Sequence, residues 1–273
     1  MPVRNGARFV GEAIESLLTQ EFTDWRLVIS DNASTDETLE ECRKAAGSDP
    51  RVEIVRQDAD IGAQGNFLRL LEQAQGKFFM WAAADDRWKP RFLAACVNRL
   101  EQDPSVGMAF TGIENIDSKG QTVRRYPDLP KLGGPPTFRT VARYLLCGES
   151  LGKANLFYSV YRLDVCRDIA RSAGLHGCWG SDMAFVLGGI ARGGIAIEPE
   201  VLFHKRLSEI EATNTVSQAK PGVIRHHGIF PQEHFAAYRA CLMSAAADTR
   251  FSAFTGILMD YRFHRARLLK WWR

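Results

Sequence analysis

The first third of the chain alternates short apolar runs with segments whose apolar side chains recur at helical spacing. The runs predict strands and the spaced segments predict helices. Ser34 and Glu37 have the spacing of a capping box at the start of the second helix, and Gly76 stands where the third should stop. The expected order is helix 7–20, strand 25–30, helix 34–46, strand 52–56, helix 66–75 and strand 77–84. Strands that alternate with helices predict an α/β fold with a parallel, doubly wound sheet.

Acidic side chains follow two of these predicted strands. Asp31 comes directly after the strand 25–30, and Asp85 and Asp86 end the apolar run. Open α/β sheets bind ligands in the crevice outside the carboxyl ends of their strands. Two carboxylates at such a position can hold a hard divalent cation. The alternative is a solvated turn in which Asp86 caps the next helix.

Composition narrows the class of protein. With 273 residues, 45% of them hydrophobic and 25% charged, the chain suits one large globular domain or one domain with an appendage. The net charge of +3 is too small to indicate a nucleic-acid partner. The six cysteines form no C-x-x-C pair, which predicts reduced thiols in a cytoplasmic protein. No apolar run reaches the roughly 18 residues of a membrane-spanning helix, and we find no signal peptide.

The second half predicts further strands over 108–116 and 155–161 and a helix over 138–148. Between them, the segment 124–137 is rich in proline. We expect it to be a mobile loop over an active site, because loops of this length inside compact domains are usually functional.

Two later segments place charged groups at unusual positions. Asp182 follows Trp179 and Gly180 and precedes an apolar helical segment, which is an odd place for a surface carboxylate. The plain alternative is an aspartate that only caps the helix. Further on, the return segment 195–203 ends in three basic residues, 204–206.

The chain also contains four short motifs in order, Pro2–Gly6, Ser30–Asp36, Gly65–Asn66 and Ala84–Asp86. Each motif alone is weak, but the ordered set resembles family 2 glycosyltransferases with the GT-A fold. The resemblance runs from residue 1 to about residue 215. It implies a GT-A domain over 1–215, a three-layer α/β sandwich with a mostly parallel central sheet. A C-terminal helical extension would follow over 216–273.

The resemblance assigns roles to individual residues. The family aspartate that matches Asp31 hydrogen-bonds the nucleobase, which suits a carboxylate that can accept the N3 proton of uracil or thymine. Asp85 would contact the ribose, and Asp86 would coordinate Mn²⁺ or Mg²⁺ on the diphosphate. Asp182 matches the aspartate that acts as the catalytic base. The other expected donor-binding residues are Pro2, Arg4, Asn5, Asn66 and Arg206, with His204 as a further metal ligand.

The basic triplet departs from the family pattern. Similar enzymes often have a Tyr-Arg-x-His-type sequence there, whose basic residues or histidine meet the diphosphate or the metal. Here the order is altered, so it stays open which of His204, Lys205 and Arg206 does so. Residues 213–215 are expected to follow as a loop that closes on the donor.

The resemblance implies an inverting, metal-dependent transferase that moves a sugar from a nucleoside diphosphate sugar to an acceptor hydroxyl. We expect a UDP- or dTDP-sugar, a saccharide or lipid-linked acceptor, and a role in polysaccharide or glycoconjugate biosynthesis. The Q-x-x-R-W motif of processive relatives is absent, which favours addition of a single sugar. The alternative is a non-catalytic sugar-nucleotide-binding or scaffold protein of the same fold. A nucleotidyltransferase on a similar sheet is more distant.

The last segment, 261–273, is basic and aromatic and contains no acid. It could lie at a membrane interface, and it could equally be a solvated helix whose tryptophans pack on the core. We therefore expect a cytoplasmic protein, with a location at the inner face of the membrane as one option.

The start of the chain is short for this family. Met1 stands directly before Pro2, where similar proteins have an apolar run that forms the central first strand. We expect the chain to lack this strand and Met1 to be an internal methionine of a longer protein. Neighbouring strands would then have unpaired backbone groups, each costing about 1–3 kcal/mol if buried. The 273-residue form should fold poorly or be inactive, and an upstream extension should restore it.

Overall fold

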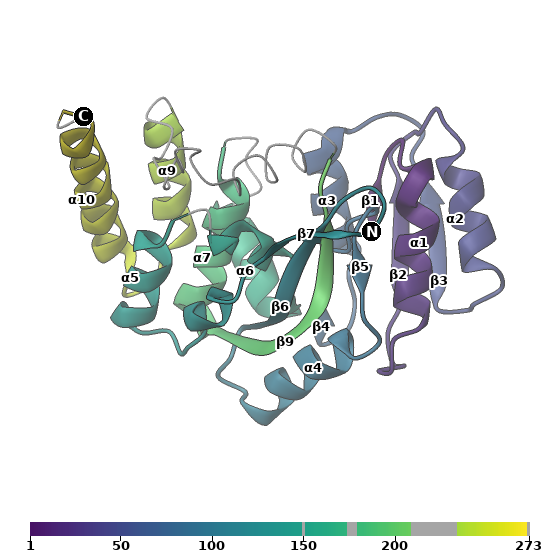
Figure 1. The fold of residues 1–273 in the computed structure, drawn as a ribbon, viewed down its shortest axis with the longest axis horizontal. Helices are drawn as coiled ribbons and strands as arrows, with labels where there is room; N and C mark the ends of the chain where they lie inside the picture. Colours follow the sequence, from purple (N-terminus) through teal and green to yellow (C-terminus); the bar gives the residue numbers. More distant parts are fainter. Residues whose placement is uncertain (149–150, 174–178, 209–233, 272–273) are drawn as a thin grey trace.

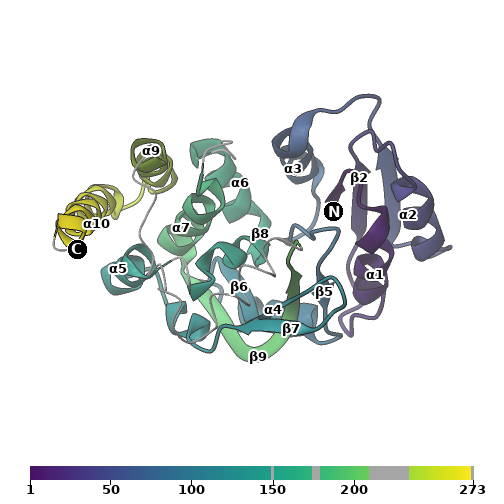
Figure 2. The same ribbon diagram turned by 45° about the horizontal axis from the view of Figure 1, so that its top comes forward.

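The computed structural model describes residues 1–148, 151–173, 179–208 and 234–271, and its chain forms two sheets with helices packed around them (Figure 1). The first sheet is three-stranded and parallel, in the order β1-β2-β3. Its strands are β1 (Pro2–Val3), β2 (Leu27–Asp31) and β3 (Val52–Arg56). The helices α1 (Ala7–Leu18) and α2 (Thr38–Ala46) lie on one side of this sheet and α3 (Gly62–Gln73) on the other (Figure 2).

The second sheet is six-stranded and mixed, in the order β4-β8-β6-β9-β5, with β7 also paired to β6. Its longest strands are β6 (Met108–Ile116) and β9 (Ile195–Arg206), which run parallel. The shorter strands are β4 (Phe78–Phe79), β5 (Arg87–Trp88), β7 (Thr122–Arg125) and β8 (Val160–Arg162). The register of β6 with β9 shifts on both sides of Gly112, where a Cβ atom would lie 2.6 Å from the oxygen of Pro199. This bulge curves β9 and directs its last residues back toward β5.

The remaining helices pack on the second sheet and on one another. α4 (Phe92–Gln102) covers β6 and β9, while α6 (Leu163–Ala173) and α7 (Ser181–Gly193) pack together. α5 (Phe138–Leu146), α9 (Phe235–Ala245) and α10 (Ser252–Trp271) lie at the end of the molecule away from the first sheet (Figures 1 and 2). None of the helices in the described ranges is long and apolar enough to cross a membrane.

An aromatic core joins the two halves beneath the predicted site. The ring of Trp81 stacks on that of Phe157, with centroids 4.7 Å apart and 9° between the planes. Phe185 of α7 meets Trp81 edge-on at 5.2 Å. Burial of the large ring of Trp81 therefore holds the residues just before Asp85 in place, since buried aromatic rings contribute most to the stability of a protein core.

The α/β class and the GT-A architecture predicted from the sequence are confirmed, but three local predictions in the first third are wrong. A two-residue strand, β1, precedes the first helix, where no strand was expected. Ser34 does not cap α2, because its Oγ accepts a hydrogen bond from Asn5 N (2.9 Å). The predicted strand 77–84 pairs only over Phe78–Phe79. The following residues are held by side chains instead, as when Trp81 Nε1 donates to the oxygen of Phe67 (3.0 Å).

Two predictions in the second half also need correction. The segment 124–137 is not a loop throughout, since it completes β7 and contains a 3₁₀ helix, η1 (Leu129–Leu132), whose two leucines are buried. The predicted strand 155–161 is instead a 3₁₀ helix, η3 (Lys153–Tyr158), followed by β8. The loop 213–215 and the domain boundary at 215–216 lie outside the described residues. The five cysteines among the described residues are free thiols, as expected.

Candidate active site

Two buried side-chain oxygen atoms near the carboxyl end of β2 accept no hydrogen bond from the described residues. Asp31 is fully buried, and its Oδ1 accepts from Ser34 N (3.2 Å). Its Oδ2 accepts no hydrogen bond from the described residues, although Arg56 Nε lies 3.8 Å away. Asn66 donates through Nδ2 to the oxygen of Ser30 (2.9 Å), and its buried Oδ1 likewise lacks a donor in the described part. Buried acceptors without donors are rare and costly, so this position suits a ligand that brings N–H groups.

The N-terminal turn lies against this end of β2. Asn5 has a positive φ of 50°, and its Oδ1 accepts from Thr35 N (2.9 Å). Arg4 Nη1 forms an ion pair with Asp60 Oδ2 (3.1 Å), whose Oδ1 accepts from Asn32 Nδ2 (2.6 Å). Pro2, on β1, pairs with Ser30 on β2. The structure thus brings Pro2, Arg4, Asn5, Asp31 and Asn66 together, and their roles in donor binding stay predictions.

Asp86 is the most perturbed carboxylate of the site. It is 1% exposed, its Oδ1 accepts from Arg206 N (2.8 Å), and its Oδ2 accepts no hydrogen bond from the described residues. Burial raises the pKa of Asp86 to about 7, against the opposing charge of Lys205. The N-cap of α4 is Arg91, so Asp86 does not cap that helix. Its neighbour Asp85 is exposed.

Asp182 lies in the first turn of α7, whose N-cap is Gly180, so this carboxylate is not the helix cap. Its Oδ1 accepts from Met183 N (2.7 Å), and burial raises its pKa. The charges of Lys205 and Lys153 oppose that rise. Tyr144 of α5 donates through its hydroxyl to the oxygen of Met183 (2.8 Å) and so holds the turn that carries Asp182.

The end of β9 divides its basic residues between two faces, because successive side chains of a strand point to opposite sides. The charges that act on His204 are those of Lys89, Arg87 and Glu114, and its pKa is lowered chiefly by burial. Lys205 instead acts on Asp86 and Asp182, with Nζ 5.4 Å from the ring centroid of Tyr158. The structure therefore brings Lys205, and not His204, to the carboxylates.

All three nitrogen atoms of the Arg206 guanidinium donate hydrogen bonds within the protein. Its Nε donates to the oxygen of Asp85 (2.9 Å), its Nη1 to the oxygen of Asp117 (3.0 Å), and its Nη2 to Glu12 Oε2. The side chain is 3% exposed. The guanidinium thus ties the Asp85 loop to α1 and to the end of β6, and its expected contact with the donor stays a prediction that this geometry does not favour.

Sequence reasoning missed two residues near this site, Lys153 and Tyr158, and left Lys205 open as one of the three basic residues 204–206. Lys153 is fully buried and donates to the oxygens of Tyr144 and Cys147 at the end of α5 (both 3.2 Å). Alternation along a strand separates Lys205 from His204 and Arg206, but it does not say which of the two faces meets the carboxylates. Tyr158 lies in the predicted strand 155–161 and Lys153 lies just before it, and both belong to the 3₁₀ helix η3.

The residues present fit a hard divalent cation in part. Asp86 Oδ2 is a buried carboxylate oxygen without a hydrogen-bond donor, and the exposed Asp85 adjoins it. However, no group of three or more potential ligands gathers among the residues that the structure describes. A cation here would take its other ligands from a bound diphosphate and from water, which is how Mg²⁺ is usually held.

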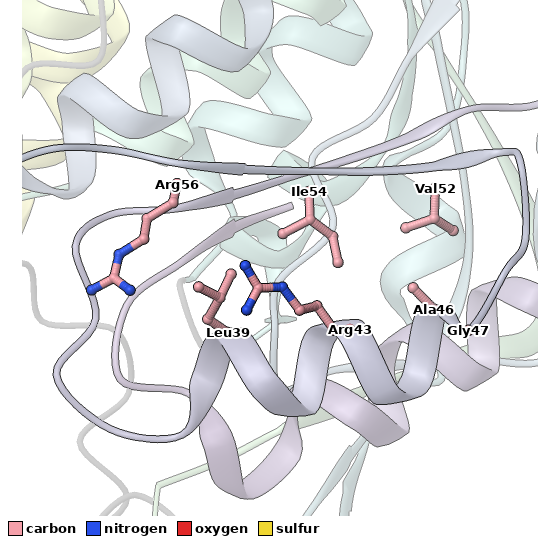
Figure 3. A pocket seen from close by; sticks show the side chains of 7 residues that line it. All are labelled: Leu39, Arg43, Ala46, Gly47, Val52, Ile54 and Arg56. Atoms are coloured by element: carbon pink, nitrogen blue, oxygen red, sulfur yellow. The ribbon is translucent and has the colours of Figure 1, made fainter.

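A hollow on the outer side of the first sheet is not this site. It lies between α2 and β3 and is lined by Leu39, Arg43, Ala46, Gly47, Val52, Ile54 and Arg56 (Figure 3). Its lining contains no carboxylate and none of the predicted site residues.

Removing the charge of Asp86 is expected to stabilise the metal-free protein. Its pKa of about 7 in the folded state exceeds the ordinary 3.8, so folding loses stability as the pH rises through that window. In EDTA, Asp86→Asn should therefore melt higher than the parent chain at about pH 8, with a smaller difference at about pH 5. Asp85→Asn, at the exposed neighbour, is the control. A variant that melts lower at both pH values would contradict the cost assigned to this charge.

Comparison with known proteins shows to which family the chain belongs. Residues 1–168 match the family model "Glycosyl transferase family 2", which is 168 of the 273 residues. The chain belongs to glycosyl transferase family 2. The matched residues contain Asp31, Asn66 and the Asp85–Asp86 pair, whereas Asp182 and the end of β9 lie beyond them.

Relatives in the family are similar over the same N-terminal part. The putative glycosyltransferase EpsE of Bacillus subtilis is 30% identical over 135 residues, 49% of this chain and 49% of that protein. The putative teichuronic acid biosynthesis glycosyltransferase TuaG of B. subtilis is 25% identical over 130 residues, 48% of this chain and 51% of that protein. Chondroitin synthase of Escherichia coli is 27% identical over 124 residues, 45% of this chain and 18% of that protein. The matched segment thus spans about half or less of these relatives.

Solved structures show the same fold at low sequence identity. Staphylococcus aureus TarS 1–349 in complex with UDP-GlcNAc has a TM-score of 0.63 at 15% identity, covering 97% of this chain and 70% of that one. The mannosyltransferase PcManGT from Pyrobaculum calidifontis, in complex with GDP-Man and Mn²⁺, has a TM-score of 0.56 at 16% identity, covering 98% and 73%. These alignments cover nearly the whole chain and show that it has the GT-A fold.

Proposed function

We propose that this family 2 member transfers a sugar, with inversion, from a nucleoside diphosphate sugar to an acceptor hydroxyl. The observation that carries the proposal is one arrangement of carboxylates. Asp31 and Asp86 each keep a buried oxygen without a hydrogen-bond donor in the described chain, and Asp86 and Asp182 both act electrostatically on Lys205. A scaffold protein has no need of three such costly groups.

The donor would bind from the end of β2 to Asp86. Asp31 Oδ2 accepts an N–H of the base, and Asn66 Oδ1 is a second acceptor beside it. A uracil or thymine base suits an acceptor of this kind, and the solved relatives bind UDP-GlcNAc or GDP-Man. Asp85, which is exposed beside Asp86, would contact the ribose.

Transfer requires a base for the acceptor and a positive charge for the leaving group. Asp182 takes the acceptor's hydroxyl proton as that oxygen bonds to the anomeric carbon, on the side opposite the diphosphate. The bond between the anomeric carbon and the phosphate oxygen breaks, and its electrons stay on the diphosphate. Lys205 stabilises that charge. A divalent cation held by Asp86, Mn²⁺ or Mg²⁺, would add Lewis-acid stabilisation to the same diphosphate.

The acceptor and cellular role follow from weaker indications. The relative TuaG, named for teichuronic acid biosynthesis, favours a saccharide or lipid-linked acceptor in polysaccharide assembly. The absent Q-x-x-R-W motif favours one sugar per acceptor. The cytoplasmic location stays a prediction.

Donor hydrolysis separates an enzyme from a binding protein of the same fold. Many transferases pass their sugar slowly to water, so the full chain should release the free sugar from at least one nucleotide sugar, faster with Mn²⁺ than with EDTA. A chain that binds the donor tightly but releases no sugar under either condition, with or without added saccharides, would instead support the non-catalytic alternative.

Asp31→Asn should weaken donor binding selectively. The amide replaces a carboxylate acceptor by a group that also donates, so it meets the base N–H with a weaker or mismatched bond, and charge-assisted bonds are worth about 1.5–3 kcal/mol. The donor Kd should rise roughly 10-fold or more, while the affinity for inorganic diphosphate stays constant. Calorimetric titration measures both. Equal losses for donor and diphosphate would contradict a role at the base.

A further inference from the structure

The large hydrophobic side chains that the described residues expose are concentrated on two helices. Phe138 and Leu146 of α5 are 49% and 42% exposed, and Ile257 and Tyr261 of α10 are 67% and 54% exposed. The fifth such side chain, Ile61, precedes α3 and is 44% exposed. In both views α5 and α10 lie at the end of the molecule away from the first sheet (Figures 1 and 2). A group of exposed hydrophobic side chains indicates an interaction surface, whereas single scattered ones do not.

Contacts show that α5 and α10 present these side chains as one surface. Ile257 and Tyr261 are one turn apart on the same face of α10. Other faces of α10 are in use, since Asp260 pairs with Arg239 of α9 (2.7 Å) and Arg262 Nη1 donates to the oxygen of Leu145 in α5 (3.1 Å). Phe254, half-buried, joins the two helices by an edge contact with Phe138 at 5.0 Å. We call the set Phe138, Leu146, Phe254, Ile257 and Tyr261 the α5–α10 patch.

The two helices that form the α5–α10 patch also carry several arginines. Arg139 and Arg143 lie on α5, Arg262 and Arg265 on α10, and Arg250 just before α10. Arg143 and Arg250 donate to the backbone oxygens of Lys131 and Pro136, bonds that position the guanidinium groups without neutralising them. The acid on the described part of α10, Asp260, is already paired with Arg239.

We propose that the α5–α10 patch docks on an anionic lipid membrane. Its aromatic and aliphatic side chains would enter the boundary between headgroups and acyl chains, and the arginines would meet lipid phosphates. A second copy of the chain fits less well, because a twofold interface would bring the same arginines of both copies together. The buried hydroxyl of Tyr144, on α5, donates to the oxygen of Met183, so α5 also contacts the turn that carries Asp182.

This surface differs from the one expected from the sequence. From the sequence, membrane contact through 261–273 was one of two options, and the side chains of 266–273 lie outside the described residues. The patch rests on α5 and on α10 up to Tyr261. Docking is also independent of the transfer reaction, so it stands or falls separately from the proposed function.

Vesicle flotation tests the docking surface. The full chain is mixed with vesicles of phosphatidylcholine alone or with phosphatidylglycerol added. We expect flotation with the anionic vesicles, weakened by salt. The double variant Ile257→Ser/Tyr261→Ser should bind roughly 10-fold more weakly or worse, since it loses two exposed side chains whose apolar surface the membrane would bury. Arg139→Glu/Arg265→Glu should weaken binding to anionic vesicles and leave the weak binding to neutral ones unchanged. Both pairs are exposed, so the fold should survive, which circular dichroism checks.

Ile61→Ser is the matched control, since it removes an exposed isoleucine outside the patch and should float like the parent chain. Three results would overturn the proposal. The parent chain could fail to float with anionic vesicles. The control could lose as much binding as the double variant. The parent could be a dimer that Ile257→Ser/Tyr261→Ser dissociates, without vesicle binding, which would assign the patch to a second copy.

Discussion

Asp182→Asn is expected to lower sugar transfer roughly 10²- to 10⁴-fold, the usual contribution of a general base. Asparagine keeps the shape of the side chain, and its oxygen can still accept from Met183 N, so α7 should stay in place. Only the ability to take a proton is lost. The donor Kd should therefore stay within a small factor of the parent value. Rates of transfer to an acceptor and calorimetric donor binding measure the two quantities.

The pH dependence gives an independent check on the same residue. The base must be ionised, and burial raises the pKa of Asp182 above the ordinary 3.8. Activity should therefore fall as the pH drops through that raised pKa, and the residual activity of Asp182→Asn should lack this acid limb.

Asp164 provides a matched control for Asp182. It is an exposed aspartate in the first turn of α6, and its Oδ1 accepts from Val165 N (2.8 Å), the same local bond that Asp182 makes. Asp164→Asn should leave transfer unchanged. Near-parental transfer by Asp182→Asn would mean that the base lies elsewhere.

Asp86→Ala is expected to abolish the dependence of donor binding on Mn²⁺. Asp86 Oδ2 is the buried carboxylate oxygen placed to bind a cation, and alanine leaves none there. The donor should bind this variant equally weakly with Mn²⁺ and with EDTA, while the parent binds more tightly with Mn²⁺. Calorimetric titrations under both conditions measure the difference. Transfer should fall with binding, because the leaving diphosphate loses its cation.

Glu101→Ala removes an exposed carboxylate that pairs with Lys77 and is the control for a general loss of negative charge. It should keep the Mn²⁺ effect. An undiminished Mn²⁺ effect in Asp86→Ala would contradict the assignment of the metal site.

The elements at the site could be predicted where they depend on local sequence. Asp31 follows a run of apolar residues with strand character, and it lies at the end of β2 as expected. Asp182 precedes a long apolar segment, and it lies in the first turn of α7. Local pattern also gave β6 its full length. These features depend on residues within a few positions of one another, which is what periodicity reports.

The contacts between distant segments could not be predicted. Asp86 Oδ1 meets Arg206 N across 120 positions of sequence, and that pairing depends on a β9 that curves at Pro199. This curvature determines that Lys205 faces the carboxylates. The guanidinium of Arg206 instead donates to Asp85, Asp117 and Glu12. Gly112 pairs with Val201 instead of Pro199, and Ile113 then pairs with Phe203 instead of Leu202, so the register shifts first by two residues and then by one. An odd total shift exchanges the two faces of a strand. Sequence alone therefore left the basic triplet open.

The predicted length of the strand 77–84 was wrong for a related reason. The run 77–84 has the apolar character of a buried strand, yet only Phe78–Phe79 pair, because a strand also needs a neighbour with free backbone groups. The apolar character was satisfied by aromatic packing of Trp81 instead.

A thermal-shift screen of nucleotide sugars with Mn²⁺ tests the central claim most directly, because a ligand that binds the folded state raises its melting temperature. At about 100 times its Kd, a donor should add roughly 2.7 kcal/mol to the free energy of unfolding. We predict that at least one UDP-, dTDP- or GDP-sugar raises the melting temperature of the full chain with Mn²⁺, and less so with EDTA. Melting temperatures that no nucleotide sugar changes, with or without Mn²⁺, would contradict a donor site between Asp31 and Asp86.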